Sequence, residues 1–360
     1  MERFFCKTKI LAGSGAVAEL KTLGAKRVFL VADPYFVKNG TADRVAKAAG
    51  CETWELFGEV QPDPTVELAA RGTARLKAFD PDLVVALGGG SAMDCAKAMH
   101  FFAKAKAPLA AIPTTSGSGS EVTDFAILTH GAVKHPLVDP ALQPDWAILD
   151  DELLRELPRS LIADGGFDVL AHAVEACAAR GAGELSDLWA REAFASCYAA
   201  LPASYAGRQE VRLKVHLAST CAGLAFTQAG LGLCHAVSHV LGGMFHVPHG
   251  RLNAIVLPAV VGINAHAAGR KYAELARAAG LGASAETLAV RNLRSGLIRL
   301  RRELSLPETL AQAGIKPRAV WNAVGEITAG VLRDPCCASN PVAADDFLIR
   351  RLLEEVTGRG

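Results

Sequence analysis

Residues 234–249, which read CHAVSHVLGGMFHVPH, concentrate side chains that can bind a metal ion. His235 and His239 stand four residues apart, and on a helix this spacing places both rings on one face. His249 follows after a glycine-rich break. A histidine on an apolar helix is often a hydrogen-bonded core residue instead, so each ring has a second interpretation that spacing alone leaves open.

A second pair of potential ligands has the same spacing earlier in the chain. Asp168 and His172 stand four residues apart in GGFDVLAHAVEA, so they would share one face of a helix. One carboxylate and two or three imidazoles suit a borderline divalent ion such as Fe²⁺ or Zn²⁺, with one coordination position left for a substrate. The two pairs together predict a metal site.

The surroundings of the histidine-rich stretch carry no Asp, Glu, Lys or Arg from Val215 through Gly250. An apolar run of that length can indicate a membrane span. Glycines, Pro248 and the histidines interrupt this one, and a histidine in lipid is unfavourable. We therefore expect the run to be the buried centre of a soluble protein.

The elements that must position these residues change character near residue 155. Before it, short apolar runs alternate with helical patterns, and the runs at residues 27–32, 83–87 and 108–113 predict buried parallel strands. After it, Ala, Leu, Arg and Glu recur at helical spacing, as in residues 184–201 and 285–304. We expect an α/β N-terminal domain over residues 1–155 and an all-α C-terminal domain, which carries the predicted metal site, over residues 156–360. In the second domain, Pro258 is expected to end or kink a helix.

Two loops rich in glycine and hydroxyl groups follow predicted strands. The first is Gly88-Gly89-Gly90-Ser91, before a helix expected from Ala92 onward. Backbone N–H groups in such a turn can bind a phosphate at the positive end of the helix, although a plain turn is an equally good interpretation of this loop alone. The second loop, PTTSGSGSEVT at residues 113–123, favours the phosphate interpretation over a flexible linker, because two such loops at neighbouring strand ends form a binding crevice.

Net charge argues against polyanionic partners. The formal net charge is +1 and charged residues make up 21% of the chain, so no broad attraction to nucleic acid or anionic lipid is expected. The N-terminal sequence MERFFCKTKIL lacks a cleavable apolar region. We expect a cytoplasmic protein that binds neither nucleic acid nor membrane.

Several ordered motifs resemble the iron-containing alcohol dehydrogenase family, whose relatives include glycerol dehydrogenase and dehydroquinate synthase. They are GGGSAMDCAKA, PTTSGSGSEVT, KHPLVDPALQPDWAILD, DVLAHAVEA, HAVSHVLGGMFHVPHG and DPCCASNP, and together they cover essentially the whole chain. The resemblance implies a dehydroquinate synthase-like fold, with an α/β N-terminal dinucleotide-binding domain and an all-α C-terminal metal-binding domain. Within the family, the segments AFTQAGLGL, SEVTDFAI and VQPDPT are most similar to the 1-propanol dehydrogenases of propanediol-utilisation systems.

The resemblance implies a role for each residue that matches the family's motifs. The metal ligands fall on Asp168, His172, His235 and His249. The further histidine of the motif falls on His239, which is expected beside the nicotinamide in proton transfer. Two positions depart from the common pattern without removing a functional group, namely Ser118 in place of threonine and GGFD in place of TGMD.

The family's cofactor contacts fall on residues of the first domain. They are Asp33, Asp63, Gly89, Gly90, Ser91, Thr114, Thr115, Ser118, Phe125 and Lys134. Asp33 would accept hydrogen bonds from the adenosine ribose of NAD(H), and a 2′-phosphate of NADP(H) would be repelled there. The alternative for Asp33 is that it only caps a turn with Pro34.

The resemblance implies a metal-dependent alcohol dehydrogenase that interconverts a small primary alcohol, such as 1-propanol, and its aldehyde with NAD(H) and Fe²⁺. Zn²⁺ is the other metal that this ligand set accepts. The alternatives are a glycerol or a lactaldehyde/1,2-propanediol dehydrogenase of the same superfamily, and a non-catalytic relative. A homodimer is expected, and association with a bacterial microcompartment is a further option.

Overall fold

The computed structural model describes residues 4–131 and 133–358. The chain divides into two compact units. One is Phe5–Leu157, and the other begins at Pro158.

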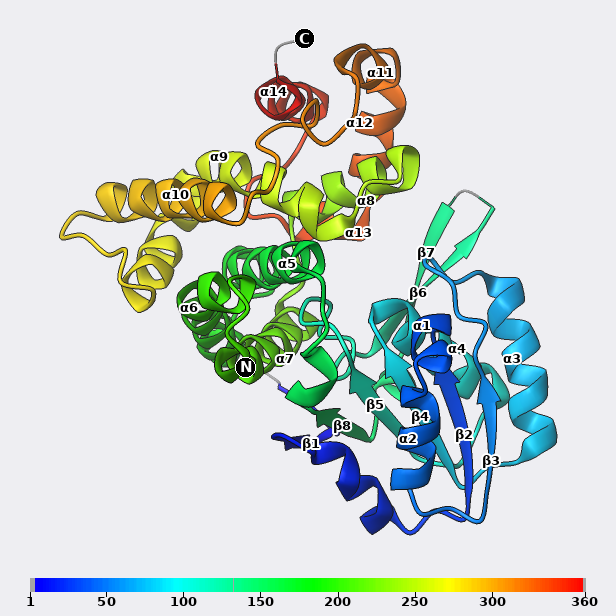
Figure 1. Cartoon of the computed structure of the whole chain (residues 1–360). Coiled ribbons are helices and arrows are strands. Elements are labelled where there is room, and N and C mark those ends of the chain that lie inside the picture. The colour runs from blue at the N-terminus through cyan, green and yellow to red at the C-terminus, as the bar shows by residue number, and fades with distance from the viewer. Residues whose placement is uncertain (1–3, 132, 359–360) are drawn as a thin grey trace. The chain divides into compact units, whose positions relative to one another are not determined.

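A six-stranded parallel sheet forms the centre of the unit Phe5–Leu157 (Figure 1). Its strand order is β1-β8-β5-β4-β2-β3. The strands are β1 (Lys9–Ala12), β2 (Arg27–Ala32), β3 (Thr53–Phe57), β4 (Leu83–Gly88), β5 (Leu109–Pro113) and β8 (Trp146–Leu149). After β3 the chain crosses back over β2 to reach β4, so the order reverses between β2 and β4. The carboxyl ends on either side of such a reversal are where open α/β sheets bind ligands.

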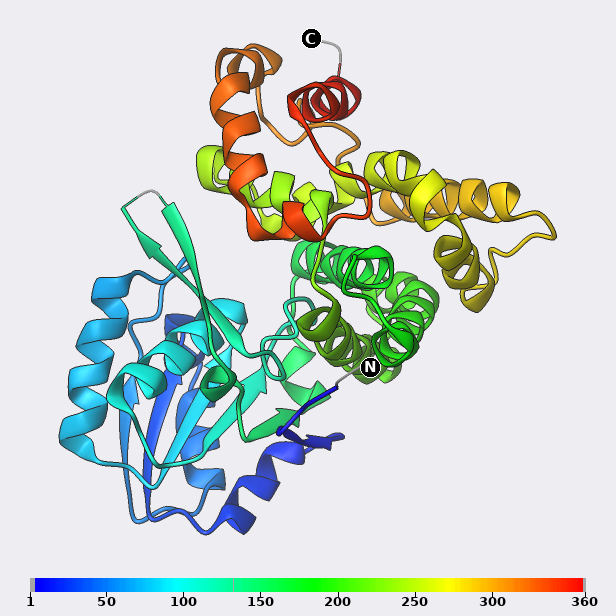
Figure 2. The same ribbon diagram turned by 180° about the vertical axis from the view of Figure 1, so that it is seen from behind.

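Helices cover both faces of this sheet, as the two opposite views show (Figures 1 and 2). The helical elements are η1 (Ala16–Leu23), α1 (Pro34–Lys38), α2 (Thr41–Ala48), α3 (Val66–Phe79), α4 (Gly90–Ala103), η2 (Pro140–Leu142) and η3 (Asp151–Leu154). Alternate residues of β2 serve the two faces: Val28 and Leu30 pack with η1 and α2, whereas Phe29 and Val31 pack with α3 and α4. Side chains alternate between faces along a strand, so a strand buried on both faces is apolar throughout.

A separate two-stranded antiparallel hairpin follows the second glycine-rich loop. It consists of β6 (Phe125–His130) and β7 (Val133–Val138). The carbonyl of Pro64 accepts a hydrogen bond from the Thr129 N–H at 2.8 Å, which ties the hairpin to the segment before α3.

The unit that begins at Pro158 is all helical in the part of the chain that the structure describes. Its helices are α5 (Arg159–Ala178), α6 (Glu184–Tyr205), η4 (Gln209–Val211), α7 (Arg212–Ala229), α8 (Leu233–Phe245), α9 (His249–Ala278), α10 (Glu286–Glu303), α11 (Pro317–Asn322), α12 (Val324–Arg333), α13 (Pro335–Ser339) and α14 (Asp346–Thr357). Helix α5 contacts α6, α7, α8 and α9, and almost all of its residues after Ser160 are buried. The expected fold class, a parallel α/β unit followed by an all-α unit, is confirmed. The expected roles of the two domains stay predictions.

Helix α9 continues through Pro258, so of the two expected outcomes the helix does not end there. A proline has no N–H to bond the carbonyl four residues earlier, which here belongs to Ala254. The guanidinium of Arg301 on α10 donates to that carbonyl at 3.1 Å, and Arg301 is itself buried. By length and composition α9 could cross a membrane, but 72% of its most apolar window is buried inside the protein, as in a core helix.

Candidate metal centre and dinucleotide site

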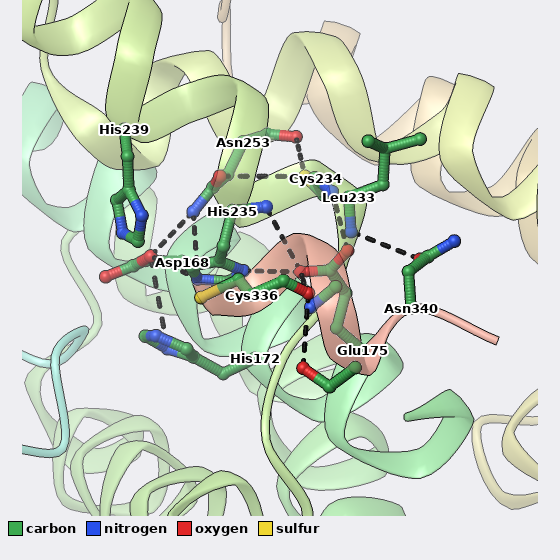
Figure 3. Close-up of polar contacts among 12 residues, drawn as sticks. Asp168, His172, Glu175, Leu233, Cys234, His235, His239, Asn253, Cys336 and Asn340 are labelled. Atoms are coloured by element: carbon green, nitrogen blue, oxygen red, sulfur yellow. Dashed lines mark hydrogen bonds and ion pairs between the residues drawn. The ribbon is translucent and has the colours of Figure 1, made fainter. Parts of the chain in front are cut away.

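Four potential metal ligands converge from three helices of the unit that begins at Pro158. Asp168 and His172 lie on α5, His235 lies on α8, and His249 is the first residue of α9. The Asp168 Oδ1 atom lies 3.9 Å from His172 Nδ1, 3.8 Å from His235 Nε2 and 3.5 Å from His249 Nε2. Figure 3 shows the imidazoles of His172 and His235 beside the Asp168 carboxylate. The structure therefore brings together all four residues that the resemblance assigns to the metal.

These separations fit the edges of a coordination polyhedron. Ligands placed about 2.1 Å from a tetrahedral ion are about 3.4 Å from one another. The three measured separations from Asp168 Oδ1, 3.5 to 3.9 Å, are slightly above that value and too long for hydrogen bonds. A carboxylate and imidazole nitrogens also form a donor set that Fe²⁺ and Zn²⁺ accept. The residues present thus fit a divalent ion.

The buried amide of Asn253 lies among the ligand atoms. Its Nδ2 is 2.8 Å from Asp168 Oδ1, 3.1 Å from His249 Nε2 and 3.4 Å from His235 Nε2. A primary amide has two hydrogens to donate, so it cannot satisfy three acceptors at once. Asn253 therefore helps to hold the cluster together and leaves acceptor capacity for a cation.

Glu175 holds the far side of His235. Its Oε2 atom lies 2.7 Å from His235 Nδ1, and both side chains are buried. The carboxylate also accepts backbone N–H groups of Gly232, Cys234 and His235 at the start of α8, which has no intrahelical partner for them. A Cβ on Gly232 would lie 2.7 Å from Glu175 Oε1, so the approach requires glycine. A proton held on His235 Nδ1 leaves Nε2 free to bind an ion.

The electrostatics of the cluster favour a cation. Burial alone would raise the pKa of Asp168, but His172, His249 and His235 lower it well below its ordinary value. Burial would likewise lower the pKa of His235, yet the neighbouring carboxylates of Asp168 and Glu175 raise it to about 9. Two buried carboxylates around one imidazole thus attract positive charge to this position, and a divalent ion could supply it in place of a proton.

His239 faces the same cluster but has a different partner. Its ring centroid is 6.0 Å from that of His235 and 5.1 Å from that of His249. Its Nδ1 lies 2.9 Å from Asp334 Oδ2, and Asp334 also accepts the Cys336 N–H at the start of α13. This contact leaves Nε2 as the atom through which His239 could exchange a proton with a ligand.

An aromatic ring lies against the cluster beside His172. The Phe226 ring stacks on His172 with a centroid distance of 4.3 Å, and His172 stacks on His235 at 4.5 Å. His246, which matches no ligand position of the family, caps the carboxyl end of α8 in a left-handed conformation and is exposed.

Asp33 lies at the carboxyl end of β2, where the strand order reverses. Its Oδ1 accepts the N–H groups of Tyr35 and Phe36 at 3.0 and 3.4 Å, so it caps α1. Its Oδ2 would lie 3.0 Å from a Cβ on Gly88, the last residue of β4. Desolvation by burial raises the pKa of Asp33, and the two backbone N–H groups lower it. Asp33 therefore does cap α1, through Oδ1, as the alternative interpretation proposed. Its Oδ2 still lies at the binding end of the sheet.

The two glycine-rich loops lie against each other at the ends of β4 and β5. A Cβ on Gly89 would be 3.3 Å from Thr115 Oγ1, and one on Gly90 would be 3.3 Å from Ser118 Oγ. The Thr114 N–H donates to the Gly88 carbonyl at 3.0 Å. Ser91 lies in the first turn of α4, which begins at Gly90 rather than at Ala92 as expected. The N–H groups of Gly90 and Ser91 come too early in α4 to bond a carbonyl of the same helix, and such groups suit a phosphate.

The remaining predicted cofactor residues lie on neighbouring segments. Asp63 is an exposed residue with φ 54° in the loop between β3 and α3, and Phe125 is the half-buried first residue of β6. Lys134 lies in β7, paired in register with Thr129, and its side chain is outside the described part of the structure. These three assignments stay predictions.

Several residues at the two sites were not singled out from the sequence. They are Glu175, Asn253, Asp334 and Lys97. Two of them carried a usable signal, because Glu175 stands seven residues after Asp168 and Asn253 four after His249, which are helical repeats of one face. Asp334 and Lys97 contact their partners only through the tertiary fold.

Comparison with known families covers both units. The model of iron-containing alcohol dehydrogenase matches residues 7–151. The model of the C-terminal part of the Fe-containing alcohol dehydrogenase family matches residues 162–357.

Curated relatives differ in length and in cofactor. The chain is 37% identical to the 1-propanol dehydrogenase PduQ of Salmonella typhimurium, over 99% of this chain and 100% of that protein. It is 35% identical to an NADPH-dependent butanol dehydrogenase of Clostridium saccharobutylicum, over 98% and 97%. It is 38% identical to the bifunctional aldehyde-alcohol dehydrogenase AdhE of Escherichia coli over 91% of this chain, but it spans only 42% of that protein's length.

Solved structures share the fold over the whole chain. An iron-containing alcohol dehydrogenase from Thermococcus thioreducens has a TM-score of 0.91 and 34% identity, with 98% of this chain and 99% of that chain covered. Sulfoacetaldehyde reductase from Bifidobacterium kashiwanohense in complex with NAD⁺ also has a TM-score of 0.91, at 26% identity with full coverage of both chains. The matches over both units show that the chain belongs to the iron-containing alcohol dehydrogenase family, whose named members are oxidoreductases that act on alcohols.

Proposed function

We propose that this protein interconverts a small primary alcohol, such as 1-propanol, and its aldehyde with NAD(H) as the hydride carrier. The observation that carries the proposal is that a ring nitrogen of His172, of His235 and of His249 each lies 3.5 to 3.9 Å from Asp168 Oδ1. A divalent ion bound there, Fe²⁺ for activity with Zn²⁺ as a competitor, would act as a Lewis acid on the substrate oxygen. We assign the four residues as its ligands.

His239 is proposed to hold or release the proton of the substrate hydroxyl. Its Nδ1 is occupied by Asp334 at 2.9 Å, so Nε2 is the exchanging atom. The Asp334 carboxylate fixes the orientation of the His239 ring, as the orienting acid does in other histidine-based proton transfers.

The side chains around the cluster favour a small, unbranched substrate. Phe226 presents an aromatic ring beside His172. The basic residue nearest to His249 along the chain is Arg251. Its guanidinium donates to both carboxylate oxygens of Asp164, at 3.2 and 2.9 Å. A guanidinium paired in this way is a poor anchor for a phosphosugar, which supports an alcohol over a phosphorylated substrate.

NAD(H) is proposed as the cofactor because of Asp33 and the two glycine-rich loops. The carboxylate at the end of β2 can accept ribose hydroxyls through Oδ2, while Gly89, Gly90, Ser91, Thr114, Thr115 and Ser118 offer backbone and hydroxyl groups to the pyrophosphate. The sulfoacetaldehyde reductase solved in complex with NAD⁺ supports the choice of NAD(H). The choice needs a test because the related butanol dehydrogenase is NADPH-dependent. Asp63, Phe125 and Lys134 are proposed to line the same site.

A second candidate function is oxidation of a polyol, as in a glycerol or a lactaldehyde/1,2-propanediol dehydrogenase. The two functions are separated by loss of NADH absorbance with propanal, lactaldehyde and other short aldehydes, and by its gain with glycerol, on iron-loaded protein. We expect propanal to have the highest kcat/KM and chelation to abolish turnover. Higher kcat/KM with lactaldehyde or glycerol would favour the second candidate, and no turnover with any of them would favour a non-catalytic relative.

We also propose a cytoplasmic homodimer, with association with a bacterial microcompartment as the further option that the resemblance to propanediol-utilisation enzymes raises. Sedimentation of the purified protein tests the dimer. Fractionation of cells that make the protein tests its location.

A further inference from the structure

Lys97 is a buried lysine that the proposed chemistry does not use. It lies on α4 and its relative exposure is 1%. Lysine is almost never fully buried unless its charge is paired, because removing an ammonium from water is costly. Its position therefore needs an explanation other than core packing.

The ammonium of Lys97 binds a segment that follows the second glycine-rich loop. Nζ donates to Ser120 Oγ at 2.9 Å, to Thr123 Oγ1 at 2.9 Å and to the Thr123 carbonyl at 3.0 Å. It also donates to the Phe125 carbonyl at 3.0 Å. Four acceptors surround three N–H groups, so the segment 120–125 is wrapped around this one charge.

Asp94 holds the same segment from one turn earlier on α4. Its Oδ1 accepts the Ser120 hydroxyl at 2.8 Å, and its Oδ2 accepts the Ile127 N–H at 3.0 Å. The Ser120 hydroxyl thus accepts from Lys97 and donates to Asp94, which fixes its orientation. Burial lowers the pKa of Lys97 to about 8, while Asp94, Glu121 and Asp124 act to raise it, so the ammonium form persists near neutral pH.

The network ends at a residue of the proposed cofactor site. The Ser120 N–H donates to Ser118 Oγ at 3.3 Å, and Ser118 lies against Gly90 at the start of α4. The loop from residue 114 to 124 contains no helix or strand of its own. Its shape depends on contacts with other elements, and the network supplies them from the same helix whose first turn carries Gly90 and Ser91.

We propose that Lys97, together with Asp94, is a positioning residue that fixes the loop 114–124 in the shape that receives the pyrophosphate of the dinucleotide. The inference rests on the proposed use of NAD(H), and it adds a residue that acts through Ser118 and Ser120 rather than by touching the cofactor. Holding both glycine-rich loops from one helix sets their separation before the cofactor binds, which reduces the cost of ordering them on binding.

The test replaces Lys97 by methionine, which keeps the length of the side chain and removes the charge. The Kd of NADH from fluorescence titration and its KM should both rise at least about tenfold, because a displaced loop no longer matches the pyrophosphate. At saturating NADH kcat should stay within about twofold and the iron content should be unchanged, since the ligands lie on other helices. Ser120→Ala, a smaller change in the same network, should raise the Kd less.

The matched control is Met99→Ala. Met99 is fully buried on the same helix and packs against Gly72 of α3, away from the loop. The Met99→Ala variant should have a lower melting temperature than the parent and an unchanged Kd of NADH. Equal NADH affinity in the parent and in Lys97→Met would overturn the inference, and where Lys97→Met does not fold, equal affinity in Ser120→Ala overturns it. Failure of the parent itself to bind NADH would instead refute the proposed function.

Discussion

The Glu175 carboxylate lies 2.7 Å from the Nδ1 atom of His235 and accepts three backbone N–H groups at the start of α8. One buried side chain therefore orients a proposed ligand and caps the helix that carries it. Partners of this kind, behind metal-binding histidines, set the tautomer and the basicity of the ring.

Glu175→Gln tests this arrangement. The amide keeps the size of the side chain but removes the charge and presents an NH₂ group to N–H donors. We expect the affinity for iron to fall by about 10- to 100-fold, measured by competition with a chelator. Glu184→Gln, at an exposed position on α6, is the control and should bind iron like the parent. Unchanged affinity in Glu175→Gln would show that His235 is oriented without it.

His249→Ala tests the ligand set. Its Nε2 lies 3.5 Å from Asp168 Oδ1, and loss of one of four ligands should remove the ion and nearly all turnover. Elemental analysis gives the metal content. His246→Asn is the control from the same segment, because asparagine tolerates the left-handed backbone that His246 adopts. Equal iron content in His249→Ala and the parent would exclude His249 as a ligand.

His239→Ala and Asp334→Asn separate proton transfer from metal binding. We expect both variants to keep their iron, because the four side chains assigned as ligands, Asp168 and the three histidines around it, are unchanged. Turnover should fall by about 10²- to 10⁴-fold in His239→Ala, the usual contribution of a general acid or base, and less in Asp334→Asn. The pH profile of kcat should change in both. A loss of iron from His239→Ala as large as that from His249→Ala would make His239 a ligand instead.

Much of the fold follows from local patterns. The strands ending at Ala32, Gly88 and Pro113 are continuous apolar runs, because a parallel strand with helices on both faces is buried on both. The i, i+4 pairs on α5 and α8 meet because helical periodicity puts them on one face. These features depend on residues that are close together in the chain, so they can be predicted from the sequence.

Other features depend on partners that are distant in the chain. Helix α9 passes through Pro258, and Arg301, on another helix, bonds the Ala254 carbonyl that the proline leaves free. From the sequence, Lys97 would be expected on the surface of α4. In the structure, the loop with Ser120 and Thr123 covers it. Such pairings are set by tertiary packing, so spacing along the chain does not predict them.

The pH dependence of stability should carry a contribution from Lys97. Its pKa is about 8 in the folded chain against an ordinary 10.5. Between these values the unfolded chain binds the additional proton, so this contribution to the free energy of unfolding rises with pH above 8 and is lost as pH falls through 8. Denaturant midpoints of the parent and Lys97→Met, compared at about pH 7.5 and about pH 9.5, should diverge in favour of the parent at the higher pH. A difference that is the same at both pH values would contradict the lowered pKa.

Cofactor choice should depend on Asp33, which also caps α1. Oδ1 accepts the Tyr35 and Phe36 N–H groups, while Oδ2 lies beside Gly88 at the binding end of the sheet. A 2′-phosphate next to this carboxylate would meet a like charge, and no arginine follows among residues 34–37 to bind it. We expect kcat/KM to favour NAD(H) over NADP(H) by a large factor.

The two functions of Asp33 can be separated by two variants. Asp33→Gly removes the charge and the side-chain cap, whereas Asp33→Ser removes the charge and keeps a hydroxyl that can cap α1. Both variants should reduce the preference for NAD(H) over NADP(H), chiefly by raising kcat/KM for NADP(H). Asp33→Ser should lower the melting temperature less than Asp33→Gly does. If the parent uses both cofactors equally, or if neither variant changes the preference, Asp33 is a helix cap alone and selectivity lies elsewhere in the site.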